Sequence, residues 1–172
     1  MNRADPNRIA KVVVALTAGD HAQVGDEGIA VGGPDAVVRA GYHGVAAVKG
    51  PGEAYVEKTG IAFAFGYGKA TGGAQNISVA GIAPQGGTPP AMAVAGDSGI
   101  AIAGNGGYAQ TGRYGVIIIY ALVPMNQPVD PRLDARTPFV GLTEPLGCLK
   151  PYTWYHLDAA HEFTEGQPLK PD

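Results

Sequence analysis

The sequence predicts an all-β fold, a β-solenoid that runs from about Val12 to Val123 in about seven coils of 16 residues, with two strands per coil. Three observations predict it. Gly28, Gly44 and Gly60 each precede a β-branched residue and lie 16 positions apart, and Asn76 takes the fourth place. Apolar residues keep the same register through successive coils, and glycine recurs at a second fixed position in the coil.

One loop insertion interrupts the repeat. The step from Asn76 to Gly99 is 23 residues, one period plus seven, and the excess falls at 83–89, whose Pro, Gln, Gly and Thr residues are typical of a loop. Gly99 and Gly115 are again 16 apart. Counting back by 16 from Gly28 places the first coil at Val12, with Val13 in the position of Ile29.

The first strand of each coil alternates with period two. The residue after the coil's first position is β-branched and apolar in every coil, and the residue two further on is mostly bulky, so we expect this bulky side to be the interior. Its members are Val13, Ile29, Val45, Ile61, Ile77, Ile100 and Val116, then Ala15, Val31, Ala47, Phe63, Val79, Ile102 and Ile118.

The second strand of each coil is expected to have one buried and one solvated side. Small residues would face the interior: Ala22, Val24, Val38, Ala40, Ala54, Val56, Ala70, Gly72, Ala93, Ala95, Ala109 and Thr111. The mixed, mostly polar set between them would face solvent: His21, Gln23, Val37, Arg39, Glu53, Tyr55, Lys69, Thr71, Met92, Val94, Tyr108 and Gln110.

A second glycine lies three residues before most coil starts. This gives corners such as Gly25-Asp26-Glu27-Gly28 and Gly96-Asp97-Ser98-Gly99. We expect glycine to supply the positive φ of these corners, and the acidic residues there to form turns.

The other side of the first strand is a nearly uncharged strip of small residues. If the bulky side is inside, this strip is outside, and we expect it to bind a partner. The strip includes Ala30, Ala46, Val48, Ala62, Ala64, Ser78, Ala80, Ala101 and Ala103. Alternatively the alanines line a thin interior, which would leave an even more apolar strip outside. Either assignment predicts that one sheet is covered, by a homodimer or another protein, or by the chain's own C-terminal segment.

The ends of a solenoid need caps, because their strand edges are unpaired. Residues 1–11 are expected to cap the N-terminal end. Residues 124–172 would form a proline-rich arm up to about Leu149, followed by a hairpin of 152–157 and 161–164 around 158–160. Trp154 and Tyr155 are candidate partner-binding residues, and the alternative is that these aromatic residues pack the cap onto the last coil.

These features together resemble a family of bacterial and phage Gly-Ala-rich β-solenoid repeat proteins of uncharacterised function. The resemblance rests on the Gly-x-x-Gly repeat with alternating small and β-branched residues, and on the closing Lys150-Pro151-Tyr152-Thr153-Trp154-Tyr155-His156-Leu157. It implies a fold and a C-terminal cap, and it implies no activity or site.

Composition narrows the classes of partner. The net charge is −3, the isoelectric point is about 5.7 and no run of Lys or Arg occurs, which argues against nucleic acid and against an anionic membrane surface. The longest apolar run, 116–124, is too short to span a bilayer. The single cysteine, Cys148, and a polar start without a signal-peptide pattern favour a cytoplasmic protein.

No pattern of reactive residues predicts an enzyme, a metal site or a cofactor. Cys148, His156 and His161 match no known ligand spacing, and Gly104-Asn105-Gly106-Gly107 is not followed by the Lys-Ser/Thr of a phosphate-binding loop. We therefore expect a non-catalytic protein-binding module, and our specific hypothesis is an immunity-type protein that neutralises a bacterial toxin by direct binding. The alternative is a structural or phage-related repeat protein that oligomerises through its alanine-rich side. A Cys/His enzyme ranks third.

Overall fold

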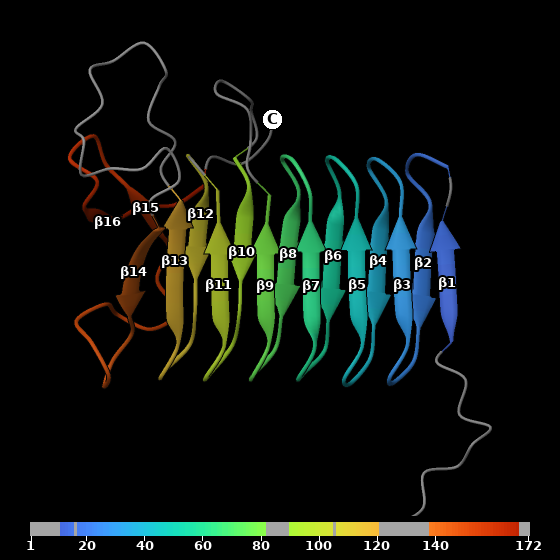
Figure 1. Cartoon of the computed structure of the whole chain (residues 1–172), viewed down its shortest axis with the longest axis horizontal. Helices are drawn as coiled ribbons and strands as arrows, with labels where there is room; N and C mark the ends of the chain where they lie inside the picture. The colour runs from blue at the N-terminus through green and yellow to red at the C-terminus, as the bar shows by residue number, and fades with distance from the viewer. Residues whose placement is uncertain (1–10, 16, 82–89, 105, 121–137, 169–172) are drawn as a thin grey trace, which may run out of the picture.

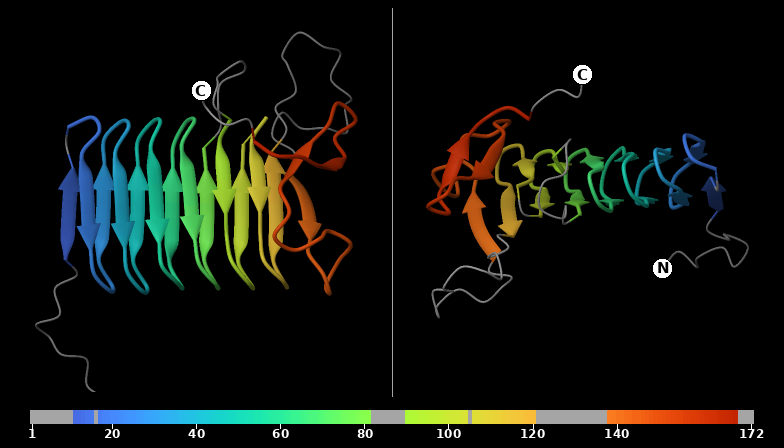
Figure 2. Two further views of the ribbon diagram at one scale, coloured as in Figure 1. Left: turned by 180° about the vertical axis from the view of Figure 1, so that it is seen from behind. Right: turned by 90° about the horizontal axis from the view of Figure 1, so that it is seen from above.

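The computed structural model describes residues 11–15, 17–81, 90–104, 106–120 and 138–168. These residues form sixteen strands joined by turns, and no helix occurs among them. The strands lie in two layers along a narrow column (Figure 1), which is equally evident from behind and from above (Figure 2). The predicted β-solenoid fold is confirmed.

Sheet A collects the first strand of every coil in the order β1-β3-β5-β7-β9-β11-β13-β14. All of its pairs are parallel except the last, between β13 and β14. The 16-residue repeat appears directly as the register, since Ile29 pairs with Val45 and Val45 with Ile61. The strands are β1 (Val12–Ala15), β3 (Ile29–Gly32), β5 (Val45–Val48), β7 (Ile61–Ala64), β9 (Ile77–Ala80), β11 (Ile100–Ala103), β13 (Val116–Tyr120) and β14 (Pro138–Leu142).

Sheet B collects the second strands in the order β16-β15-β12-β10-β8-β6-β4-β2. Strands β1 to β12 therefore make six coils, and β13 begins a seventh that the C-terminal cap completes. The strands are β2 (His21–Val24), β4 (Val37–Ala40), β6 (Glu53–Val56), β8 (Lys69–Gly72), β10 (Met92–Val94), β12 (Tyr108–Gln110), β15 (Tyr155–Leu157) and β16 (Phe163–Glu165).

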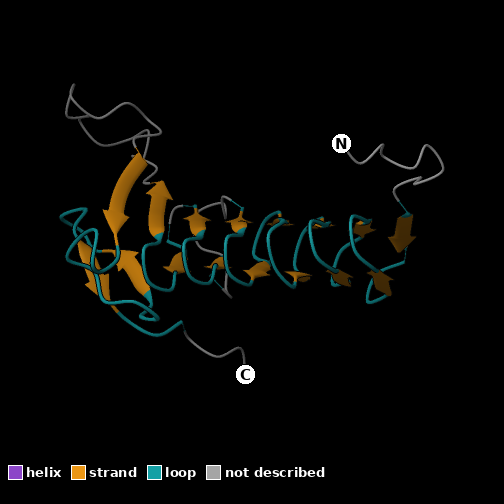
Figure 3. Cartoon of the chain, turned by 90° about the horizontal axis from the view of Figure 1, so that it is seen from below, coloured by secondary structure: helices purple, strands orange, loops and turns teal. Residues whose placement is uncertain are grey.

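Small side chains from both sheets fill a thin interior. On sheet B the predicted inward residues are buried, and on sheet A the alanines are buried: Ala30, Ala46, Ala62, Ala64, Ala101 and Ala103 are all 0% exposed. The expectation that the bulky side of the first strand faces inward is therefore wrong, and the alternative of an alanine-lined interior is confirmed. Corners of only about four residues hold the two sheets close together (Figure 3), and the interior is filled mostly by Ala and Val, with the larger Ile117 and Ile119 in β13.

The first coil is one residue longer than predicted. Val12, and not Val13, pairs with Ile29, while Val13 pairs with Ala30 and packs against the core. The loop between β1 and β2 takes up the extra residue, because β2 keeps the 16-residue step from His21 to Val37. A shift of one residue exchanges the two faces of a strand, so it is the burial of Val13 that fixes this register.

The coil-start glycines are required for close packing and not for positive φ. The positive φ falls on the residue before each of them, as at Glu27, His43 and Thr59, with φ of 58°, 55° and 53°. A Cβ at Gly44 would lie 2.6 Å from the Cβ of Ala40, and one at Gly28 would overlap the side chain of Val24. The expectation about φ is therefore wrong at these corners.

At the fourth corner, two positions have residue types opposite to those of the other coils. Asn76 replaces the usual glycine, and Gly72 stands where the other coils have Ala, Val or Thr. Asn76 is fully buried and occupies the space that a side chain at position 72 would need. The Ser78 hydroxyl donates its hydrogen bond to the Val94 carbonyl at 2.6 Å and also lies 3.0 Å from Asn76 Oδ1, which makes a polar layer between the two apolar core clusters.

The C-terminal segment closes the open end of the column. Strand β14, within the stretch predicted as an irregular arm, pairs with β13, and Tyr155 of β15 pairs with Ala109 of β12. The hairpin is confirmed, with β15 and β16 antiparallel and Asp158 accepting hydrogen bonds from Ala160 N and Glu162 N. The predicted N-terminal cap at 1–11 falls almost wholly outside the described residues, as do the 83–89 insertion and the part of the arm at 121–137.

Candidate functional site

The outward side of sheet A is an unbroken apolar surface. Two rows of side chains cross all eight strands in register, and all sixteen positions are apolar. We call these two rows the apolar face. The first row is Val12, Ile29, Val45, Ile61, Ile77, Ile100, Val116 and Leu142, and the second is Val14, Val31, Ala47, Phe63, Val79, Ile102, Ile118 and Val140.

The side chains of the two rows are partly to largely exposed in the part of the chain that the structure describes. Val12 and Val140, at the two ends, are 57% and 58% exposed, whereas Ile77 in the middle is 37% exposed. Each inner residue is flanked on both sides by its row, which explains the lower values without any covering segment among the described residues.

The outward side of sheet B has a different character, as predicted. His21, Gln23, Arg39 and Glu53 point to solvent there, and Arg39 lies over the ring of Tyr55 at 5.8 Å. Polar and charged groups thus accompany apolar ones on sheet B, whereas the apolar face of sheet A carries none.

A notch lies along the rim of sheet A, one position beyond the apolar face. Phe65 and Tyr120 flank it, and Gly81 and Gly104 stand between them where no side chain fills the space. Val79 and Ile102 of the apolar face also line this cavity of about 420 Å³. Phe65, 56% exposed, stacks on Phe63 with ring centroids 6.1 Å apart and planes at 10°. The rim therefore presents one projecting aromatic ring beside one apolar hollow.

The partner-binding residues predicted from the alanine strip lie in the core instead. Ala30, Ala46, Val48, Ala62, Ala64, Ala80, Ala101 and Ala103 are at most 2% exposed. No partner can reach these side chains while the coils are intact, so the predicted surface is corrected to the opposite side of the same strands.

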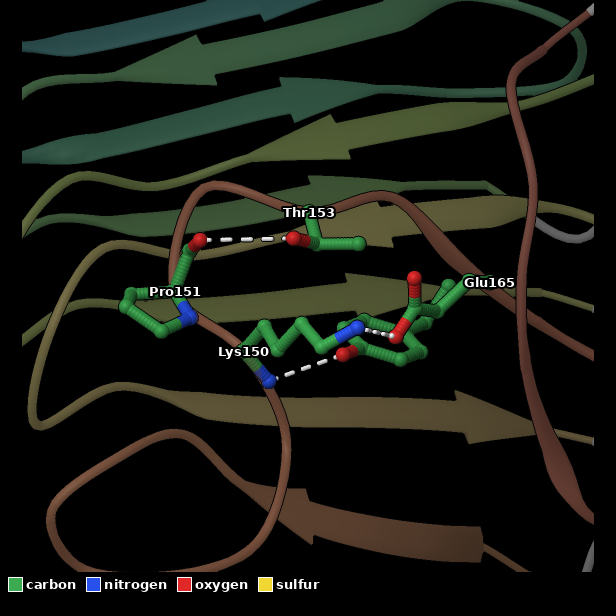
Figure 4. Close-up of polar contacts among 5 residues, drawn as sticks. Lys150, Pro151, Thr153 and Glu165 are labelled. Carbon is green, nitrogen blue, oxygen red and sulfur yellow. Dashed lines mark hydrogen bonds and ion pairs between the residues drawn. The ribbon is translucent and has the colours of Figure 1, made fainter.

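Tyr155 holds the cap together and Trp154 is partly exposed beside it. Tyr155 is 3% exposed, and its hydroxyl accepts a hydrogen bond from Lys150 N at 2.8 Å. Burial raises the pKa of this phenol. Lys150 also pairs with Glu165 at 2.8 Å, and Thr153 donates to the Pro151 carbonyl at 3.4 Å (Figure 4). The cap-packing interpretation is thus confirmed for Tyr155.

A second set of contacts joins the cap to a solenoid corner. Asp97 accepts hydrogen bonds from the Tyr152 hydroxyl at 2.5 Å and from Arg113 N at 2.7 Å. The tyrosine bond and then the backbone bond lower the pKa of Asp97, and the same tyrosine bond raises the pKa of Tyr152. Asp26 accepts from Tyr42 N in the same way, 16 residues on, so both acidic corner residues tie adjacent coils together.

The candidate Cys/His residues lie in separate surroundings. His156 packs on Tyr108 and His161 on Phe139, with centroid distances of 5.0 and 5.3 Å. Cys148 is an exposed free thiol. Within the described ranges, no group of three His, Cys, Asp or Glu side chains is placed to hold a metal ion.

The sequence contained a signal for the apolar face, which the bulky-side expectation missed. In both strands of the coil, the residues at alternate positions on one side are almost all Ala or Val. Two sheet sides with such small residues pack against each other only across a thin interior. The sequence contains no comparable indication of the notch at 81 and 104, because a glycine that follows a strand is typical of a turn and does not indicate a cavity.

Comparison with known proteins adds no relative: no family model, no curated protein and no solved structure matches the chain. No described segment forms a helix long and apolar enough to cross a membrane. The resemblance to a bacterial and phage solenoid family stays a prediction.

Proposed function

We propose that this protein is a non-catalytic protein-binding module and that it binds through the apolar face of sheet A. The observation that carries the proposal is the pair of uninterrupted apolar rows across eight strands. The fold does not require them, because the small residues on the other side of the same strands already fill the interior.

The size of the surface supports the proposal. Eight strands at a spacing of about 4.8 Å, most of them four residues of about 3.4 Å long, give a face of about 520 Å² in projection. This is near the upper end of the roughly 300–600 Å² of the largest apolar patch on a typical monomer, and such patches are often functional. We therefore infer that another protein covers this face.

The type of bound protein is a further proposal. An immunity-type module that occludes a bacterial toxin would use this surface as its docking site, and its polar sheet B would keep the complex soluble. The oligomerising repeat protein is the second candidate, and the absence of charge from the two rows favours it. In this second candidate, the copies would associate through the bulky side of the first strand of each coil and not through its alanine side.

Photo-cross-linking in the native host tests the proposal. We would introduce p-benzoylphenylalanine in place of Ile77 on the apolar face and, as a matched control, in place of Tyr55 on sheet B, because both residues are 37% exposed. We expect defined protein adducts from position 77 and few from position 55. Equal or absent adducts at position 77 would contradict the proposal.

A further inference from the structure

We propose that the occupant of the apolar face is a second copy of this chain, packed face to face about a two-fold axis parallel to the strands, with Phe65 of each copy in the notch of the other. This inference rests on the proposed binding role of the face and names the partner.

The described C-terminal segment does not cover the face. Strand β14 extends sheet A at its edge, and β15 and β16 extend sheet B. The N-terminal strand β1 forms the other edge of sheet A. The residues from 138 to 168 therefore lengthen the column and leave its apolar side free of themselves.

The chemistry of the face suits contact with itself. In a two-fold dimer every patch meets its own equivalent, so any charge near the axis would meet a like charge. The two rows contain no charge. On the rim that carries the notch, the counterpart of Phe65 in the preceding coil is Lys49. In the proposed dimer it lies beside the partner's Tyr120 ring, which is a favourable place for an ammonium group.

The positions of Phe65 and the notch fix the axis. Phe65 follows β7, the fourth strand of sheet A, and the notch lies between the fifth and sixth strands, β9 and β11. A two-fold axis parallel to the strands places the notch rim of one copy against the notch rim of the other. For Phe65 of one copy to lie over the notch of the other, the axis must lie midway between the two features. That midpoint is about a quarter of a strand spacing from the centre of the eight-strand sheet. The two faces then overlap along all but about half a strand.

The axis position that seats Phe65 in the notch nearly coincides with the position that gives full overlap of the two faces, and the two positions are set by different features of the chain. The place of the notch follows from which coils carry glycine at its rim, at positions 81 and 104, and full overlap depends on how many strands lie on each side. The face of about 520 Å² in projection gives about 1,000 Å² in total for the two partners, which is at the low end of the areas of specific interfaces. We therefore expect a specific dimer that dissociates on dilution.

Sedimentation equilibrium of the purified full chain tests the dimer. We expect the wild type to be dimeric at micromolar concentration, and Phe65→Ala to raise the dissociation constant roughly thirty-fold or more, as for an anchor residue in a pocket. Tyr55→Ala on sheet B is the matched control and leaves it unchanged. Circular dichroism checks that each variant is folded. A monomeric wild type, or an unaffected Phe65→Ala dimer, would overturn the inference.

Spin-label distances test the axis. Cys148 is the chain's single, exposed cysteine beyond β14, and Lys58 lies at the corner before β7. Both are at the end where the parallel strands of sheet A begin. The proposed axis separates the two Cys148 labels by roughly 36 Å along the column, and labels at Lys58→Cys, in a Cys148→Ala background, by roughly 7 Å. An axis along the column gives no such difference, and that result would refute the arrangement.

The outcomes separate this inference from the proposed function. If the pure protein is a monomer but position 77 cross-links to a different protein in the host, the second copy is refuted and the binding role stands. If the pure protein is a monomer and position 77 yields no more adduct than position 55, both are refuted.

Discussion

The two sheets of this solenoid share one interior and have unlike exteriors. Inward side chains of both are mostly small and buried, whereas the outward side carries polar and charged groups among apolar ones on sheet B and is wholly apolar in the two rows of sheet A. The repeat and the narrow coil explain the interior of both sheets. They do not explain the exteriors, which are free to vary, so the difference between them reflects what each sheet contacts.

The largest expected effect tests the assignment of the two sides of sheet A. Ala46 and Ala47 are neighbours in β5, but Ala46 is fully buried and Ala47 faces outward. Ala46→Leu would force a large side chain between the two sheets, and we expect it to lower the free energy of unfolding by about 3 kcal/mol or more. Ala47→Leu should change it by less than about 1 kcal/mol. Urea denaturation measures both, and equal losses would mean that the sides are wrongly assigned.

The exchange at the fourth corner tests whether the two sheets share one interior volume. Gly72 ends β8 of sheet B, and Asn76 precedes β9 of sheet A. Gly72→Ala would place a Cβ on the Asn76 side chain, and we expect a loss of about 2 kcal/mol.

The double variant Gly72→Ala/Asn76→Gly restores the pattern of the other coils and removes the buried, unpartnered Asn76 Nδ2. It should recover most of the stability in the same denaturation experiment. Additive losses in the double variant would show that the two positions do not compete for space.

A buried polar contact joins the cap to the corner before β13 at Thr143. Its buried hydroxyl donates to the Gly112 carbonyl at 2.7 Å and accepts from Gly115 N at 2.8 Å. Thr143→Val keeps the shape and leaves both backbone groups without this partner, so we expect a loss of about 1–2 kcal/mol. Thr153→Val, which removes only the weaker bond to Pro151, serves as the control. Thermal unfolding that ranks the two variants in the reverse order would refute this role for Thr143.

The smallest effect concerns acid pH at the Asp97 corner. The pKa of Asp97 is lowered in the folded chain, first by the Tyr152 hydroxyl. Its contribution to stability is therefore complete above the unfolded-state pKa, near 3.8, and is lost as the pH falls through the lower folded-state value. An NMR titration of the carboxyl carbon should show the Asp97 pKa rising towards 3.8 in Tyr152→Phe. No rise would mean that the tyrosine bond does not hold the carboxylate.

Sequence reasoning predicted the repeat, the insertion, the polar side of sheet B and the hairpin, because spacing and turn chemistry are local properties. It assigned the wrong side of the first strand to the core, since bulky β-branched residues are common in interiors and the depth of the coil cannot be read from one strand. It also missed β14, whose proline at position 138 suggests an irregular segment but is tolerated at a sheet edge. The Phe65 notch arises only when strands 16 and 23 residues apart are stacked.

One coil offers a direct test of the central claim that the exteriors differ because sheet A binds a second copy. Val79 in β9 and Val94 in β10 are the same residue type in the same coil, each partly exposed on the outward side of its sheet. Sedimentation velocity of Val79→Lys and Val94→Lys over a range of concentrations should show a monomer for the first and a wild-type-like dimer for the second. Two dimers, or two monomers, would contradict the claim.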